Sequence, residues 1–89
     1  MNDHQKFYSD VTASLRSLRI HMGQNIRSIR QQKRMPLKKL ARLSRLHPDT
    51  IDHLELGKGE INLTHIIRLA VAMDVAPEKL LVFDHYEER

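Results

Sequence analysis

Six histidines and eleven acidic residues are the side chains of this sequence best suited to chemistry. Histidine and carboxylate groups bind metals where three or four of them converge. No two histidines are four residues apart, the chain has no cysteine, and Asp49 with His53 would supply too few ligands. The sequence therefore predicts no metal site and no cofactor.

Catalytic patterns give no better support for chemistry. The chain has no glycine-rich phosphate loop. A serine, a histidine and an aspartate somewhere in a short helical chain are expected by chance. We therefore expect a binding protein rather than an enzyme.

The basic residues are concentrated in one part of the chain. Residues 11–48 contain no acid and ten Lys or Arg, whereas acids outnumber bases from Asp49 onward. This asymmetry favours a polyanionic partner, with nucleic acid ahead of an anionic membrane surface. The N-terminus does not resemble a secretory signal, and no apolar run could span a bilayer, so we expect a cytoplasmic protein that does not bind membranes.

Helices must position these charges, because apolar residues recur every three or four positions and strand alternation is absent. Residues 10–33 form either one long helix or two helices joined near Gly23. Pro36 starts a second helix over residues 36–44. Its inward residues are predicted to be Leu37, Leu40, Ala41 and either Leu43 or Ser44.

Three further helices are predicted. Pro48 opens a short one that ends at Gly57 and points Ile51 and Leu54 inward. Asn62 caps the most apolar helix, which should lie centrally in the core. The apolar residues of this helix are Leu63, Ile66, Ile67, Leu69, Ala70 and Met73. Pro77 begins a fifth short helix, and residues 84–89 form a frayed tail.

The fold class is therefore all-α, a compact bundle of about five short helices. Two short helices joined by a tight connection inside such a bundle form a helix-turn-helix. The second of them is too short to be stable by itself, so packing through Ile51 and Leu54 must hold it. It would then present polar residues, among them Asp49, Thr50 and His53, to a DNA major groove.

The sequence resembles the Cro and phage-repressor class of helix-turn-helix proteins, which is called the XRE family. The resemblance covers about residues 22–82. It rests on GQNIRSIRQQKRMPLKKLARLSRLHPDTIDHLELGKG followed by LTHIIRLAVAMDVAPEKLL. It divides the chain into an N-terminal helical extension (1–21), a DNA-binding domain (22–82) and a short tail (83–89).

The resemblance also implies roles for individual residues. Arg30 would form a structural ion pair with Glu55. The positions matching base-reading residues are Pro48, Asp49, Thr50 and His53. The positions matching phosphate contacts are Leu37 and Leu56 through their backbones, and Lys38, His47 and Lys58 nearby.

Two departures from the family pattern affect these roles. Leu37 stands where the family usually has glutamine, which removes one polar contact and leaves the helix N-terminal N–H groups. Arg45 replaces the turn glycine, so it either adopts a left-handed conformation at about 1 kcal/mol or alters the turn. Its charge would offset that cost by binding a phosphate.

Two sets of charges have competing explanations. Lys38 and Lys39 oppose the dipole of their helix, which favours phosphate binding by Lys38 over a merely solvated surface and leaves Lys39 open. Asp49 could accept a hydrogen bond from a cytosine amino group or simply complement the helix dipole. For Asp52 the dipole explanation is preferred.

The sequence thus predicts a regulator that binds double-stranded DNA and acts as a repressor, in the form of a homodimer on a palindromic operator. The alternative is an antitoxin-like module that binds a partner protein such as a toxin, with DNA binding secondary. An apolar stripe over residues 11–18 could pack on its own core or join a second subunit.

Overall fold

The computed structural model describes residues 1–82, which form four α-helices and a 3-10 helix. The helices are α1 (Asp3–Gln32), α2 (Leu37–Ser44), α3 (Pro48–Glu55) and α4 (Leu63–Met73), and the 3-10 helix is η1 (Pro77–Leu81). The all-α prediction is confirmed, with a 3-10 helix as the fifth element. The predicted tail at residues 84–89 lies outside the described residues.

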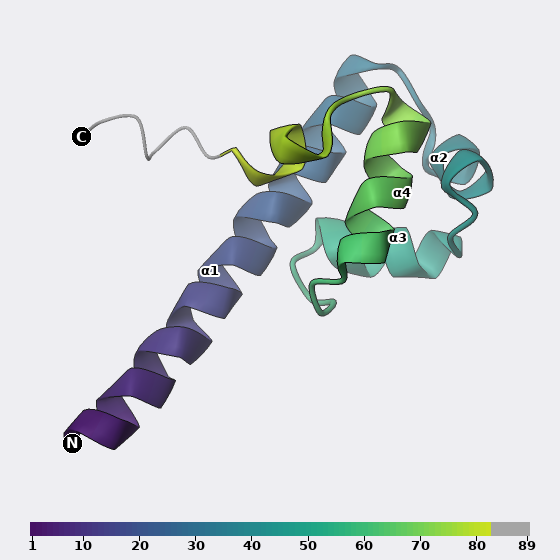
Figure 1. Cartoon of the computed structure of the whole chain (residues 1–89). Coiled ribbons are helices and arrows are strands. Elements are labelled where there is room, and N and C mark those ends of the chain that lie inside the picture. The colour runs from purple at the N-terminus through teal and green to yellow at the C-terminus, as the bar shows by residue number, and fades with distance from the viewer. Residues whose placement is uncertain (83–89) are drawn as a thin grey trace.

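Helix α1 is a single unbroken helix of 30 residues, so the one-helix alternative is correct. It starts at Asp3 rather than near residue 10, because Asn2 and Gln5 form a capping box. The Asn2 Oδ1 accepts from the Gln5 N–H at 2.8 Å, and the Gln5 Oε1 accepts from the Asn2 N–H at 3.1 Å. The N-terminal half of α1 projects well away from the body formed by the other elements (Figure 1).

Gly23 does not break α1; it is the place where α1 meets the end of α3. A Cβ on Gly23 would lie 2.8 Å from the carbonyl oxygen of Glu55 and closer still to that of Leu54. Only glycine therefore allows the two backbones to approach this closely.

The core lies between the C-terminal half of α1 and the three shorter α-helices, with η1 closing it. Its buried apolar residues are Met22, Ile26, Leu40, Ala41, Ile51, Leu54, Ile66, Leu69, Ala70, Met73 and Leu80. Ser44, rather than Leu43, is the fourth inward residue of α2. Among residues 1–82, no helix is long and apolar enough to cross a bilayer.

Helix α4 packs into the core as expected, but not all of its apolar residues are buried. Leu63 is 71% exposed and Ile67 is 51% exposed, whereas Ile66, Leu69, Ala70 and Met73 are buried. Successive residues of a helix are about 100° apart, so the apolar residues of α4 spread over a wide part of its surface. The rest of the protein contacts only part of that apolar surface. Periodicity alone could not say which edge of this wide stripe faces solvent.

Candidate nucleic-acid interface

The turn between α2 and α3 is closed by a residue that is not glycine. Arg45 adopts a left-handed conformation, with φ of 59° and ψ of 37°. The N–H of Leu46 donates to the Ala41 carbonyl at 3.1 Å, and Arg68 Nη1 donates to the Arg45 carbonyl at 3.3 Å. Of the two alternatives for Arg45, the structure contains the left-handed one, with the side chain exposed.

Helix α3 begins with His47 and Pro48. The His47 Nδ1 accepts from the N–H of Asp49 at 3.1 Å, which caps the helix, and Pro48 occupies its first turn. The side chains of Asp49, Asp52 and His53 are exposed, and those of Pro48 and Thr50 are partly exposed. The four expected base-reading residues therefore all lie on α3, accessible to solvent.

The end of α3 is closed by Gly57, which has φ of 73°. The N–H of Gly57 donates to the Leu54 carbonyl at 3.1 Å, and that of Lys58 donates to the His53 carbonyl at 2.9 Å. The N–H of Leu56 already donates to the Asp52 carbonyl at 3.0 Å. A phosphate contact through the Leu56 backbone would have to share that hydrogen bond, whereas Lys58 is exposed and available.

The start of α2 carries the other expected phosphate contacts. Pro36 precedes the helix, and no side chain caps it. Leu37 is half-buried against the core, which accounts for a leucine where the related family has glutamine. Lys38 and Lys39 are exposed on the first turn, next to the N–H groups that a phosphate would bind.

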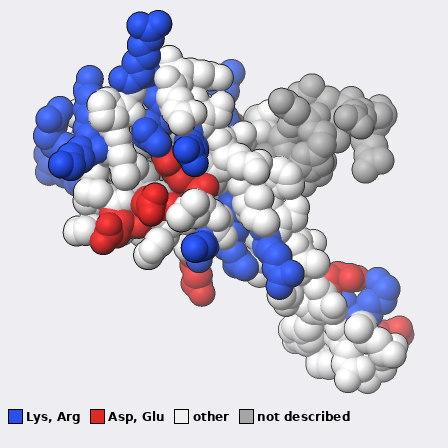
Figure 2. All heavy atoms as spheres, turned by 180° about the vertical axis from the view of Figure 1, so that it is seen from behind, with Lys and Arg blue, Asp and Glu red and all other residues white. Residues whose placement is uncertain are grey.

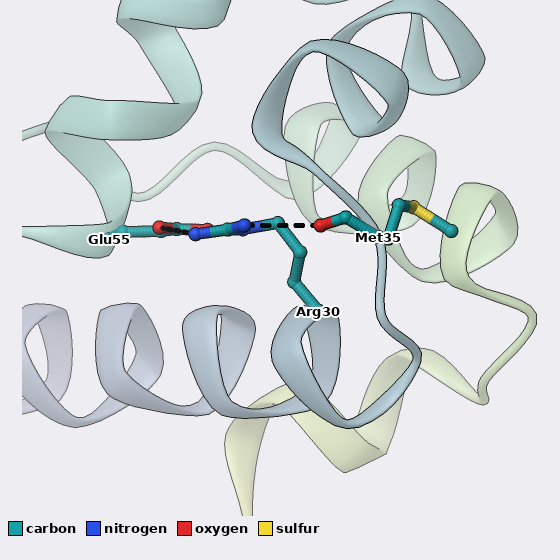
Figure 3. Close-up of polar contacts among 3 residues, drawn as sticks. All are labelled: Arg30, Met35 and Glu55. Carbon is teal, nitrogen blue, oxygen red and sulfur yellow. Dashed lines mark hydrogen bonds and ion pairs between the residues drawn. The ribbon is translucent and has the colours of Figure 1, made fainter.

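Arg30 and Glu55 form the ion pair expected from the sequence (Figure 3). Arg30 Nε donates to Glu55 Oε2 at 2.7 Å and Nη2 donates to Oε1 at 2.9 Å. Arg30 Nη1 donates to the Met35 carbonyl at 3.1 Å. The side chains are only 14% and 5% exposed, so the pair links α1, the segment before α2 and the end of α3 inside the body. The hydrogen bond to Glu55 raises the pKa of Arg30 above its usual value, so the guanidinium stays charged.

A hollow that the sequence did not predict lies beside α3. It is lined by Thr50, His53, Leu54, Gly59, Glu60, Ile61, Asn62 and His65. Asn62 caps α4 by accepting from the His65 N–H at 3.2 Å, so the hollow places the start of α4 next to the exposed side of α3. The predicted cap at Asn62 was the available signal, but only the fold shows that it adjoins Thr50 and His53.

Charged side chains are unevenly distributed over the surface, and the body carries acidic as well as basic ones (Figure 2). Lys and Arg side chains gather on the body, whereas the projecting half of α1 is largely uncharged with a few charges of both signs (Figure 2). In residues 1–82, no three metal-binding side chains come together. The surface thus offers cations around a short polar helix.

Helix α2, the turn at Arg45 and α3 together form a helix-turn-helix with an exposed second helix, which defines a class of DNA-binding proteins. The helix-turn-helix family model matches residues 26–80. The chain belongs to this family, the XRE-type helix-turn-helix proteins. No curated protein sequence matches it.

Three solved structures are similar to this chain. The restriction-modification controller protein C.AhdI from Aeromonas hydrophila is 32% identical, with a TM-score of 0.68 over 70% of this chain and 94% of that one. The clp gene regulator ClgR from C. glutamicum is 30% identical, with a TM-score of 0.69 over 72% and 83%. The hypothetical transcription factor NHTF from Neisseria is 29% identical, with a TM-score of 0.73 over 78% and 79%. Family and neighbours support DNA binding in transcription regulation, a function that generally involves no enzyme activity.

Proposed function

We propose that this protein is a cytoplasmic repressor that binds a palindromic DNA operator as a homodimer. The observation that carries the proposal is the exposed polar side of α3, held in place by a buried ion pair at its C-terminal end. A helix of eight residues is unstable alone, so this support lets it enter a groove as a rigid element.

Base recognition is assigned to the exposed side of α3. Asp49, Thr50 and His53 would contact base edges, with Pro48 packing beside them. The two exposed carboxylates of α3 would repel phosphates, so they weaken non-specific binding and favour discrimination. Asp49 then accepts from a cytosine amino group, while Asp52 mainly complements the helix dipole.

Phosphate binding is assigned to both ends of the helix-turn-helix. Lys38 and the Leu37 N–H act at the start of α2, and Arg45 and His47 act at the turn. Lys58 acts beyond α3, with the Leu56 backbone beside it. These contacts would set the register of α3 on the duplex, and two subunits would place their α3 helices about 34 Å apart, in successive major grooves. Repression follows when the bound dimer excludes polymerase.

The names of the similar structures support a regulator. They describe a controller protein, a gene regulator and a hypothetical transcription factor. The controller is associated by its name with restriction-modification and the regulator with a clp gene. Restriction-modification and the clp gene are thus associated with those two proteins and are not proposed for this chain.

The experiment that tests the proposal is selection of bound duplexes from a random DNA pool at two salt concentrations. We expect a palindromic consensus whose half-site centres lie about 34 Å, one helical turn, apart. Raising the salt should weaken binding while preserving the consensus, because phosphate contacts release counterions. Binding that is sensitive to salt but blind to sequence would contradict the proposal and favour the partner-binding module.

A further inference from the structure

The projecting half of α1 carries an apolar stripe that the body does not cover. Tyr8, Val11, Leu15 and Leu18 recur at steps of three and four, with Phe7 beside them. Phe7 is 60%, Val11 40% and Leu15 43% exposed. A shallow groove runs along this part of the helix. It is lined by Phe7, Asp10, Val11, Ser14, Leu15 and Leu18.

This stripe continues the side of α1 that packs into the core. The same three-and-four spacing runs on from Leu18 to Met22 and Ile26, which are 1% and 0% exposed. The body first approaches α1 on another side, at Ile20, whose Cα would lie 3.0 Å from a Cβ placed on Gly57, and it covers the side of the stripe from Met22 onward. One side of α1 is therefore covered by the body on its C-terminal half and bare on its N-terminal half.

Residues 1–17 are all exposed, so this part of α1 is a helix of about four turns without tertiary support. A helix of that length is only marginally stable in water, because most helical stability in proteins comes from packing an apolar side. Apolar spacing of three and four suits packing against another helix. A partner that covers the stripe would therefore stabilise this part of α1, and the spacing of the stripe suits a helical partner.

We propose that a second copy of this chain covers the stripe, with the two α1 helices antiparallel and Val11 near the two-fold axis. A parallel pair is disfavoured by the position of the body. Both bodies would then occupy the same space on the shared side of the helices, at Met22 and beyond. In the antiparallel pair each body lies past the N-terminus of its partner, and Leu15 faces Phe7 of the partner subunit.

The spacing of the two bodies argues for this occupant over an unrelated helix. The end of α3 packs on α1 at Gly23, twelve residues from Val11, which is about 18 Å along the helix. The two α3 ends then lie about 36 Å apart along α1, close to the roughly 34 Å between successive major grooves. This step rests on the proposed operator-binding function, which it deepens by naming the surface that joins the two subunits.

The first test is the mass of the full chain by sedimentation equilibrium without DNA, from about 1 µM to 1 mM, the Kd range of weak specific complexes. We expect association by the wild type and at least tenfold weaker association by Leu15→Asp. Ala13→Asp is the matched control, because Ala13 is exposed two residues away on the opposite side of the same helix. It should associate like the wild type.

The second test uses the absence of native cysteine. Mixed chains carrying Phe7→Cys and Leu15→Cys should form the mixed disulfide faster than Leu15→Cys links to itself. Faster self-linking of Leu15→Cys would show a parallel pair and overturn the arrangement. Ala13→Cys should link slowest.

Three outcomes of the mass measurement would overturn the proposal. They are a monomer at every concentration, undiminished association of Leu15→Asp, and association lost only in Val71→Asp, which would place the interface on the exposed side of α4. A protein that is monomeric without DNA but still selects a palindromic DNA sequence would overturn the α1 pairing alone. An associating protein that binds DNA without sequence preference would overturn the proposed function alone.

Discussion

Gly23 of α1 lies directly against the backbone carbonyl of Leu54 in α3, with no room for a side chain between the two helices. We expect Gly23→Ala to reduce the free energy of unfolding by about 1–3 kcal/mol, the usual effect of overpacking, despite the higher helix propensity of alanine. Urea denaturation followed by circular dichroism measures this. Gly59→Ala is the control, because the nearest atom to its new Cβ would be a side-chain carbon of Leu54 at 3.2 Å, whereas the Cβ at Gly23 would overlap backbone carbonyl groups. Equal losses in both variants would contradict the explanation.

Breaking the ion pair at the base of α3 should be more damaging. We expect Arg30→Met alone to lower the free energy of unfolding by about 3–5 kcal/mol, because it leaves the buried Glu55 carboxylate uncompensated. The double variant Arg30→Met with Glu55→Leu should lose much less than the two single variants added together. Additive losses, measured by chemical denaturation of all four proteins, would show that the two side chains act independently.

The left-handed residue in the turn offers a stabilising substitution. Arg45→Gly should raise the free energy of unfolding by about 1 kcal/mol, because glycine adopts φ of 59° without a Cβ penalty. It should also weaken DNA binding if the Arg45 charge contacts a phosphate. Asp74→Gly, at a second left-handed position with φ of 59°, is the control that should gain stability without losing a cation near α3. Thermal melts and DNA titrations separate the two effects.

Exposed lysines at the two ends of the helix-turn-helix should act on all DNA sequences alike. Lys38→Ala or Lys58→Ala is expected to weaken binding evenly and to reduce the slope of log affinity against log salt by about 1. Lys79→Ala is the matched control, since Lys79 is exposed on η1, which packs on α1 and α4. A loss confined to one sequence would contradict a phosphate contact.

Asp49 should affect selectivity rather than overall affinity. Asp49→Ala is expected to relax the preference at one base pair, while non-specific binding stays the same or increases because a negative charge is removed. Competition between single-base variants of the selected operator measures this change. Unchanged selectivity would leave Asp49 with only its helix-dipole role, and Asp52→Ala shows what removal of a nearby carboxylate does by itself.

Much of this architecture could be predicted from sequence because its signals are local. Pro48, Gly57 and Asn62 mark helix ends through their own backbone and side-chain chemistry, and the structure has helix ends at each. The start of α1 was missed because its capping box uses Asn2 and Gln5 in a polar segment. The exposure of Leu63 and Ile67 could not be predicted, because only tertiary packing decides which apolar residues of α4 are covered.

The candidate site divides in the same way. The Arg30–Glu55 pair, 25 positions apart in the sequence, was expected from a family resemblance and not from spacing. The hollow shared by α3 and the start of α4 depends on how distant segments fold together, so the predicted cap at Asn62 was not enough to indicate it. The contacts assigned to Lys38, Asp49 and Lys58 depend on the shape and sequence of a second molecule, so they stay predictions.

Because α1 is continuous, the number of residues between its uncovered stripe and the body determines the direction in which the stripe faces. Each residue inserted between the stripe and Ile20 would turn the stripe by about 100° around the helix and move it about 1.5 Å further from the body. A single insertion or deletion there would point the stripe away from its present side without altering any contact in the core. Seven inserted residues would nearly restore its direction, about 20° short of two full turns. The number of residues in the uninterrupted helix therefore determines the direction in which the stripe of the N-terminal half faces.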